Sequence, residues 1–202
     1  MEIIIEPVTS GEDESAMRQI RREVFEREMG INLERAAAPD NGKMAHLLAR
    51  VYPGREAVGT LSVVDTSGDA RLHASHNLGF EPRARAARFM HLAVVKPFRG
   101  RSIPLMMMLE AHRRFIAPVR YEFTWLLFDA ERAPTSFLTR LLGFTPQSGV
   151  FVSEYGRRCP LVRDEGAEEC ARALQLAGQS LGRAGAFHAL TRSNGLPSAL
   201  SV

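Results

Sequence analysis

The sequence has little cysteine, little lysine and no long apolar run, and each shortage argues against a class of protein. Only two of the 202 residues are cysteines, Cys159 and Cys170, and their spacing indicates neither a disulfide framework nor a metal site. No apolar run approaches the roughly 18 residues that a membrane-spanning helix needs. The N-terminus lacks the basic region and cleavage site of a signal peptide. We therefore expect a cytoplasmic protein with no membrane contact and no metal.

Arginine carries nearly all the positive charge, because Lys43 and Lys96 are the only lysines. Arginine forks favour carboxylate and phosphate partners, but here they are scattered along the chain rather than gathered in one stripe. The formal net charge of +3 is only mildly basic, and no nucleic-acid-binding motif accompanies it. We expect no nucleic-acid partner.

Hydrophobic periodicity predicts alternating strands and helices in one α+β (layered α/β) domain. Strands are expected at residues 3–8, 45–52, 57–65, 88–95, 121–128 and 150–154. Helices are expected at residues 13–29, 102–116 (ended by Pro118), 134–142 and 165–181, with 31–44 as loop and 71–85 as irregular chain. The order predicts a mixed, mostly antiparallel sheet flanked by helices. The domain spans residues 1–164, a helix at 165–181 packs on it, and 182–202 form a flexible tail.

The segment from Leu92 to Leu105 has the pattern that carries chemistry. An apolar strand runs into a tight, basic turn that contains Gly100, and a helix follows. The N-terminus of a helix presents unpaired amides and the positive end of its dipole, which suits phosphate oxygens. Arg99 and Arg101 could add guanidinium contacts. The alternative is a solvated turn with no ligand.

This segment resembles the acyl-CoA-binding core of the GNAT (GCN5-related N-acetyltransferase) superfamily. The matching residues are Leu-Ala-Val at 92–94, Pro97 and Arg-Gly-x-x-Ile at 99–103, and Leu-Gly-Phe at 142–144 resembles a later signature of the superfamily. The resemblance implies a GNAT fold, a V-shaped opening between the strands at 88–95 and 121–128, and transfer of an acyl group to an amine. The donor-binding residues that it implies are Leu92, Ala93, Val94, Arg99, Gly100, Arg101, Ser102 and Ile103.

The turn departs from the superfamily pattern at two glycine positions. Ser102 and Pro104 replace them, so the phosphate site loses an N–H donor and gains bulk. Proline is tolerated in the first turn of a helix, and Ser102 can act as the N-cap. The donor therefore remains open between acetyl-CoA, another acyl-CoA and an acyl carrier protein thioester.

The expected acid and base positions are also altered. Thr139 stands where many members place a tyrosine that protonates the leaving thiolate, and Arg88 stands where some place a glutamate base. His91 is the nearest titratable group on the strand, and an imidazole suits proton transfer near neutral pH. His91 and Thr139 are the catalytic candidates. The alternative for His91 is a hydrogen-bonded core histidine.

The N-terminal half resembles one branch of the superfamily. Arg21, Phe25 and the Gly30-Ile31 pair are similar to the first helix of autoinducer synthases and long-chain N-acyl amino acid synthases. Gly59 fits a strand motif of that branch, but Ser62 occupies its arginine position. Three functions remain open: a general N-acyltransferase, a synthase of acylated amino acids or lactones, and a silent acyl-CoA-sensing or partner-binding module. The acceptor amine and a homodimer are also left open.

Overall fold

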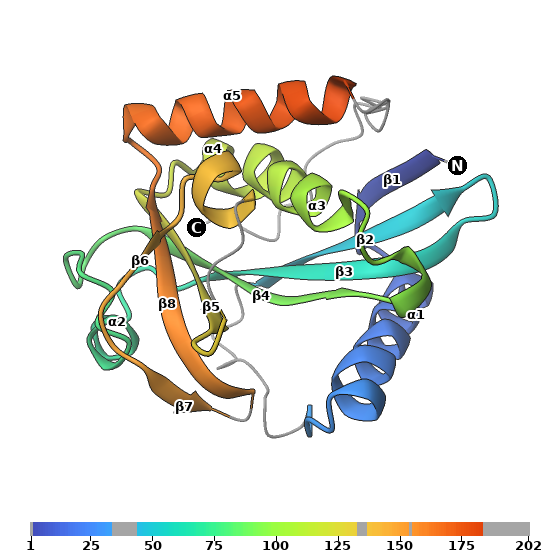
Figure 1. The fold of residues 1–202 in the computed structure, drawn as a ribbon, viewed down its shortest axis with the longest axis horizontal. Coiled ribbons are helices and arrows are strands. Elements are labelled where there is room, and N and C mark those ends of the chain that lie inside the picture. The colour runs from blue at the N-terminus through green and yellow to red at the C-terminus, as the bar shows by residue number, and fades with distance from the viewer. Residues whose placement is uncertain (1, 34–43, 133–136, 154, 184–202) are drawn as a thin grey trace.

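One mixed sheet of eight strands forms the centre of the fold, in the order β1-β2-β3-β4-β5-β8-β6, with β7 paired to β8 (Figure 1). It is seen in a computed structural model that describes residues 2–33, 44–132, 137–153 and 155–183. Only β4 and β5 are parallel; the other described strand pairs are antiparallel. The predicted fold class, a mostly antiparallel mixed sheet flanked by helices with a C-terminal helix, is confirmed.

The helices and strands have the following bounds. The strands are β1 Glu2–Pro7, β2 Met44–Tyr52, β3 Glu56–Asp65, β4 Ala86–Val94, β5 Phe123–Asp129, β6 Thr145–Pro146, β7 Phe151–Ser153 and β8 Gly156–Asp164. The helices are α1 Gly11–Arg21, η1 Arg22–Glu28, α2 Ala70–Ser75, η2 Lys96–Phe98, α3 Ile103–Ala111, η3 His112–Ile116, α4 Ala117–Val119, η4 Phe137–Leu141 and α5 Glu168–Arg183. The helices α1 and η1 are continuous, as are α3, η3 and α4.

Three sequence predictions were wrong. The stretch 71–85 is not wholly irregular, because Asp69 accepts a hydrogen bond from the Leu72 amide and starts α2 there. Pro118 does not end its helix; it lies in the first turn of α4, where proline is tolerated, and the helix ends at Arg120 with a φ of 58°. The strand at 150–154 is not the last one, since β8 follows it. Most of the loop at 31–44, the start of the helix at 134–142 and nearly all of the tail at 182–202 lie outside the described residues.

The strand β8 was not predicted, because its arginines and its proline are unusual in a central strand. It pairs with β5 along one edge and with β6 and β7 along the other. Arg163 on β8 is 1% exposed, and its charge is matched by Glu165 at 2.6 Å. A buried arginine needs a charged partner of this kind. Glu165 is only two residues away in the sequence, but the sequence does not show that its carboxylate will be buried beside Arg163.

The helix α1 begins at a capping box. The Ser10 hydroxyl accepts a hydrogen bond from the Asp13 amide at 3.1 Å, and the Asp13 carboxylate accepts one from the Ser10 amide at 3.1 Å. Met17, Ile20 and Phe25 then lie buried at helical spacing against the sheet. In Figure 1, α1 covers one side of the sheet, and α3 and α5 cover the other.

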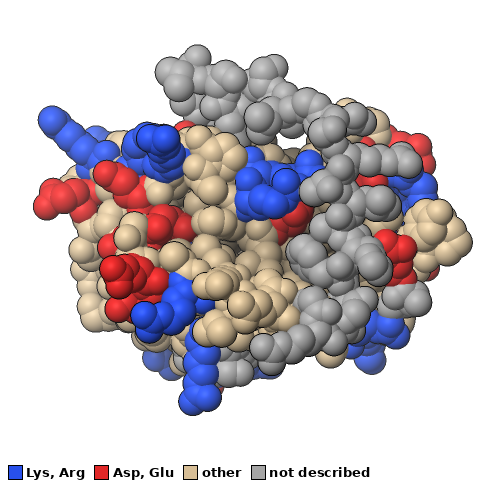
Figure 2. Space-filling model, turned by 90° about the horizontal axis from the view of Figure 1, so that it is seen from above, with Lys and Arg blue, Asp and Glu red and all other residues tan. Residues whose placement is uncertain are grey.

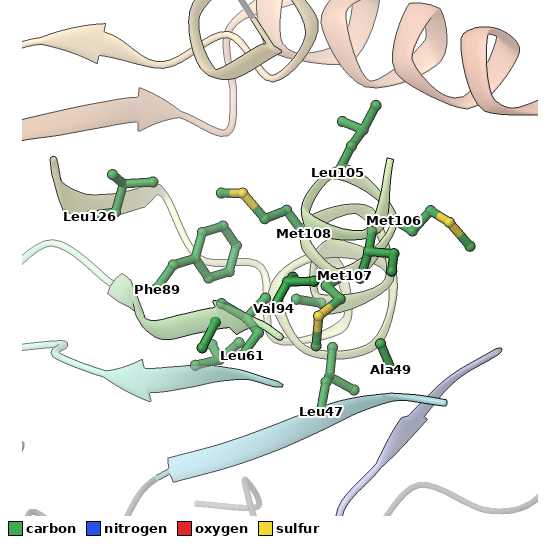
Figure 3. Packing of buried hydrophobic residues seen from close by; sticks show 14 of the residues in the cluster. Leu47, Ala49, Leu61, Phe89, Val94, Leu105, Met106, Met107, Met108 and Leu126 are labelled. Atoms are coloured by element: carbon green, nitrogen blue, oxygen red, sulfur yellow. The ribbon is translucent and has the colours of Figure 1, made fainter. Parts of the chain in front are cut away.

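The three methionines of α3 lie in the core, as their helical position predicts. Met106, Met107 and Met108 are 5%, 0% and 1% exposed. Figure 3 shows Met107 pointing toward Leu47 of β2 and Met108 pointing toward Phe89 of β4. The helix approaches the sheet closely because Gly59 lies beneath it: a Cβ atom at that position would be 3.3 Å from the Met107 sulfur.

The C-terminal helix α5 packs through one face, as its pattern predicts. Cys170, Ala173, Ala177 and Leu181 are buried, and the helix lies against α3. None of the described helices is long and apolar enough to cross a bilayer. On the face seen in Figure 2, acidic and basic side chains are interspersed rather than gathered by sign.

We predict that Leu181→Ala lowers the free energy of unfolding by about 2–5 kcal/mol, because it leaves a cavity under a side chain that is 1% exposed. The matched control is Leu176→Ala on the same helix, where the leucine is 48% exposed and the change should stay within about 0.5 kcal/mol. Urea unfolding followed by circular dichroism measures both. If both variants lost the same free energy of unfolding, the buried face of α5 would not be the face that stabilises its packing.

Candidate functional site

The parallel strands β4 and β5 diverge soon after they begin. They pair only where Ala86, Ala87 and Arg88 meet residues 123–125. Beyond Arg88, no described strand pairs with the edge of β4 that faces β5, although its other edge pairs with β3 as far as Val94. Backbone N–H and C=O groups on that edge can therefore bond an extended ligand as a neighbouring strand would.

A β-bulge interrupts β4 at the candidate base. Met90 pairs with Ser62 and Ala93 pairs with Thr60, so His91 and Leu92 together oppose a single residue of β3. His91 has a φ of 52°, in the left-handed region that only a few per cent of residues other than glycine adopt. The bulge turns the His91 ring to the α1 side of the sheet, where it lies 3.5 Å from the Ser62 hydroxyl.

The turn after β4 is fixed by Arg99. Its Nε donates to the Val94 carbonyl at 2.8 Å, and its terminal nitrogen forms an ion pair with Glu28 at 2.7 Å. The side chain predicted to meet a phosphate therefore ties the turn to β4 and to the end of η1. Arg101 is also exposed, and its guanidinium carbon lies 5.5 Å from the Phe98 ring centroid.

The helix α3 begins one residue later than predicted, at Ile103. Ser102 is the N-cap residue, but its side chain makes no capping hydrogen bond, and Pro104 lies in the first turn. Gly100 has a φ of 77°, and a Cβ atom there would meet nothing within 4 Å. In the part of the chain that the structure describes, the amides of Gly100, Ser102 and Ile103 make no backbone hydrogen bond. They can serve as donors to a bound anion.

Three further polar side chains surround His91, and sequence reasoning had not grouped them. Arg21 donates to the Ser62 hydroxyl at 2.6 Å, and His46 Nδ1 lies 2.9 Å from the same hydroxyl and 3.3 Å from Arg21. Leu61 and Val63, the two chain neighbours of Ser62, face the α3 side, because successive side chains of a strand alternate between its faces. The sequence held separate signals for two of them, Arg21 in the first helix and Ser62 at the arginine position of the resembled strand motif, and none for His46.

The cluster assigns a tautomer to both histidines. An arginine can only donate, so His46 Nδ1 accepts, and the Ser62 hydroxyl donates its proton to that nitrogen. The Ser62 oxygen then accepts from the N–H at His91 Nδ1, 3.5 Å away, so Nε2 is the ring nitrogen of neutral His91 that carries no proton. Burial, with the nearby Arg21 charge, lowers the pKa of His46 to about 4, so His46 is neutral near pH 7.

Phe25 lies beside His91 and links it to a second aromatic ring. Phe25 lies edge-on to the His91 ring at 6.1 Å and to the Tyr155 ring at 5.8 Å. Tyr155 comes from the turn between β7 and β8, so the site is assembled from both ends of the chain. Through Phe25, the first helix, which resembles that of the autoinducer and N-acyl amino acid synthases, lies next to the candidate base His91.

The second catalytic candidate lies apart from this cluster. Thr139 is partly buried on η4, and no hydrogen bond among the described residues links it to His91.

Cys170 lies on the buried face of α5, where burial raises the pKa of its thiol to about 12, so it is not a reactive thiolate. A cavity of about 840 Å³ opens near the start of β5, lined among others by Arg83, Tyr121 and Glu165, and none of the predicted site residues lines it.

The fold is similar to solved structures of N-acyltransferases. FeeM, an N-acyl amino acid synthase from uncultured soil microbes, matches with a TM-score of 0.64 and 14% identity over 89% of this chain and 97% of that one. BjaI, a CoA-dependent acyl-homoserine lactone synthase solved with SAM and isopentyl-CoA, matches with a TM-score of 0.60 and 16% identity over 87% and 90%. NAA60 of Arabidopsis thaliana, solved with a bisubstrate analogue, matches with a TM-score of 0.56 and 17% identity over 80% of this chain and 97% of that one.

These matches define the class of fold. The chain has the GNAT fold, as its motifs predict, and FeeM and BjaI are synthases of the kind that its first helix resembles. No protein-family model matches the sequence, and no curated protein sequence matches it significantly. At these identities the likeness establishes the fold, and the substrates have to be inferred from the chemistry of the site.

Proposed function

We propose that the protein is a cytoplasmic N-acyltransferase that moves an acyl group from an acyl-CoA thioester to an amine. Beyond Arg88, the edge of β4 with which no described strand pairs leads into the amides at the start of α3, and this arrangement is the observation that carries the proposal. The donor would extend along Leu92, Ala93 and Val94, with its phosphates at the turn 99–103. The transferase domain spans residues 1–164, with α5 packed against it.

In the proposed reaction the amine attacks the thioester carbonyl directly. A nitrogen–carbon bond forms, the carbon–sulfur bond breaks, and the pair of electrons leaves on the thiolate. Backbone amides of β4 polarise the carbonyl, and Nε2 of His91 accepts the amine proton. Thr139 is too poor an acid to protonate the thiolate readily, so solvent or the protonated His91 supplies that proton.

A second candidate is the synthesis of acylated amino acids or lactones from a longer acyl chain. Phe25 and Arg21, the residues that resemble this branch, both reach the His91 cluster, and that placement favours the candidate. The two candidates differ in the acyl chain and in the acceptor rather than in the acyl-transfer step.

We predict that saturating acyl-CoA raises the melting temperature, because a ligand that binds only the folded state stabilises it by mass action. Differential scanning fluorimetry with acetyl-CoA and with a long-chain acyl-CoA measures the shift. Arg101→Ala should weaken the affinity about three- to tenfold through loss of an exposed charge-assisted contact. Arg99→Ala should weaken it further, since it also releases the turn from Val94.

Arg18→Ala is the matched control, because that arginine lies on the outer face of α1 with 60% of its side chain exposed. A larger shift with the long-chain donor would favour the synthase candidate. No shift with either donor would remove free CoA from the proposal and leave a carrier-protein thioester or a silent partner-binding module. Mass spectrometry of a ligand that co-purifies with the protein would decide between those two.

A further inference from the structure

Arg88 lies on the α1 side of the sheet, on the same strand as His91. It pairs with Val64 of β3, two residues from Ser62, and cross-strand neighbours and alternate residues share a face. His91, three residues further along, would face the other side of a regular strand. The bulge at His91 adds a residue and brings both side chains to one face.

Trp125 holds the guanidinium of Arg88 in a fixed orientation. The guanidinium carbon lies 4.6 Å from the centroid of the indole, which is 0% exposed and donates to the Thr66 hydroxyl at 3.1 Å. Stacking on a ring occupies the flat face of a guanidinium and leaves its edge, with its N–H donors, for a planar acceptor. Arg88 is therefore pre-oriented for recognition by its edge.

The charge of Arg88 is not balanced within the described chain. Its Nε is buried without a hydrogen-bond partner, and none of the described carboxylates lies within ion-pair distance. Burial lowers the pKa of Arg88 to about 10, with Tyr155 opposing that change. A buried cation without an anion is costly, and such groups are retained where a ligand completes them.

Arg21 adds a second guanidinium on the same side. Its Nε is also buried without a hydrogen-bond partner, and its bonded neighbours are the neutral Ser62 and His46. Arg21 bonds the Ser62 hydroxyl, which also contacts His91. Arg88 pairs with the residue two positions along β3 from Ser62, so the two cations lie on one face of the sheet close to His91. Two guanidinium groups on one face, with none of the described carboxylates within ion-pair distance of either, define an anion-binding site.

We propose that Arg88 and Arg21 bind the carboxylate of the acyl acceptor, so that the acceptor is a small amine that carries a carboxylate, such as an α-amino acid. This inference rests on the proposed function for the role of the amine. The amine would meet Nε2 of His91 while the carboxylate meets the edge of Arg88. Three residues of strand span at most about 10 Å, so a ligand that bonds both side chains has its amine and carboxylate close together.

The location excludes the donor phosphates as the intended anion. The turn at 99–103 and the start of α3 lie beyond the far end of β4, whereas Arg88 lies where β4 and β5 still pair. At about 3.3 Å per residue, the six residues from Arg88 to Val94 already separate the two regions by roughly 20 Å. The two anion sites therefore serve the two ends of the reaction separately.

Binding of amino acids tests the proposal without any need for turnover. The probes are L-tyrosine, L-phenylalanine and L-leucine, each paired with its carboxamide, titrated into the protein saturated with acetyl-CoA or with a long-chain acyl-CoA and followed by calorimetry. The free acids should bind at least about tenfold more tightly than the amides, because the amide removes the charged acceptor. Arg88→Gln should remove that preference, Arg88→Lys should keep part of it, and the exposed Arg132→Gln should keep all of it.

Each variant is first checked by circular dichroism and by its affinity for acyl-CoA, which Arg88→Gln should leave unchanged. If Arg88→Gln does not fold, the preference measured on Arg88→Lys and on wild type decides. Equal binding of acids and amides, no binding of either, or an undiminished preference in the Arg88 variants would overturn the carboxylate site. Preferential binding of acids by a protein that acylates no amine would retain the carboxylate site and refute the proposed transferase.

Discussion

Replacing His91 with alanine should lower kcat by about a hundred- to ten-thousandfold, the usual contribution of general acid–base help. The affinity for acyl-CoA should change little, because the donor is expected to bond the backbone of β4 rather than this ring. Steady-state kinetics with an amine found by screening, together with donor binding by fluorimetry, separates the two effects. The Ser62 contact predicts which nitrogen acts, because it assigns the ring proton of neutral His91 to Nδ1 and leaves Nε2 unprotonated.

The matched variant is His91→Asn. Asparagine tolerates the left-handed backbone that His91 adopts, with its φ of 52°, and it offers no base near neutral pH. It should therefore fold as well as wild type and be as slow as the alanine variant. The wild-type rate should fall toward acid pH, because a protonated imidazole cannot accept the amine proton. A variant that kept the wild-type rate and the same acidic limb would make His91 a structural residue only.

Replacing Glu165 with glutamine should lower the free energy of unfolding by about 3–5 kcal/mol, because it leaves Arg163 as a buried cation without a partner. Glu165 bonds Arg163 at 2.6 and 2.8 Å, lies 3.2 Å from His112, and accepts a hydrogen bond from Thr124. Its side chain is 6% exposed, so solvent screens little of this network. Urea unfolding at neutral pH measures the loss.

The same network predicts how stability depends on pH. Burial alone would raise the pKa of Glu165, but the bonds from His112, Arg163 and Thr124 lower it to about 2. A lowered pKa stabilises the folded state above the unfolded value of 4.5, and this contribution fades as pH falls from 4.5 toward 2. The loss over that range is on the order of 3 kcal/mol, at 1.36 kcal/mol per pKa unit.

Glu131→Gln is the control for both measurements, because that carboxylate is 71% exposed and its nearest ion-pair contact is at 4.0 Å. It should change neither the neutral-pH stability nor the acid limb. If wild type and Glu165→Gln lost stability equally between pH 4.5 and 2, the acid sensitivity would belong to other carboxylates. Stability unchanged by Glu165→Gln at neutral pH would show that Arg163 finds another partner.

Strong local patterns made most elements predictable from the sequence. The strands β2 and β3 form where strands were expected at 45–52 and 57–65, and α1 and α3 follow the periodicity of their apolar residues. The strand β8 could not be predicted, because the reason for burying Arg163 is a carboxylate whose position depends on the whole fold. The helix α2 depends on a single cap at Asp69, a signal too short to stand out against its Gly-, Pro- and Arg-rich surroundings.

The candidate site divides in the same way. The sequence by itself determined the proposed donor side, since the strand at 92–94, the turn and the start of α3 are contiguous and their chemistry can be read in order. Only the tertiary structure decided the proposed acceptor side, where Arg21, His46 and Ser62 come from three separate elements to lie beside His91. The β-bulge that turns His91 to the same face as Arg88 depends on the register between β3 and β4. That register is set by the pairing of the two strands in the folded sheet, and no local sequence pattern in either strand specifies it.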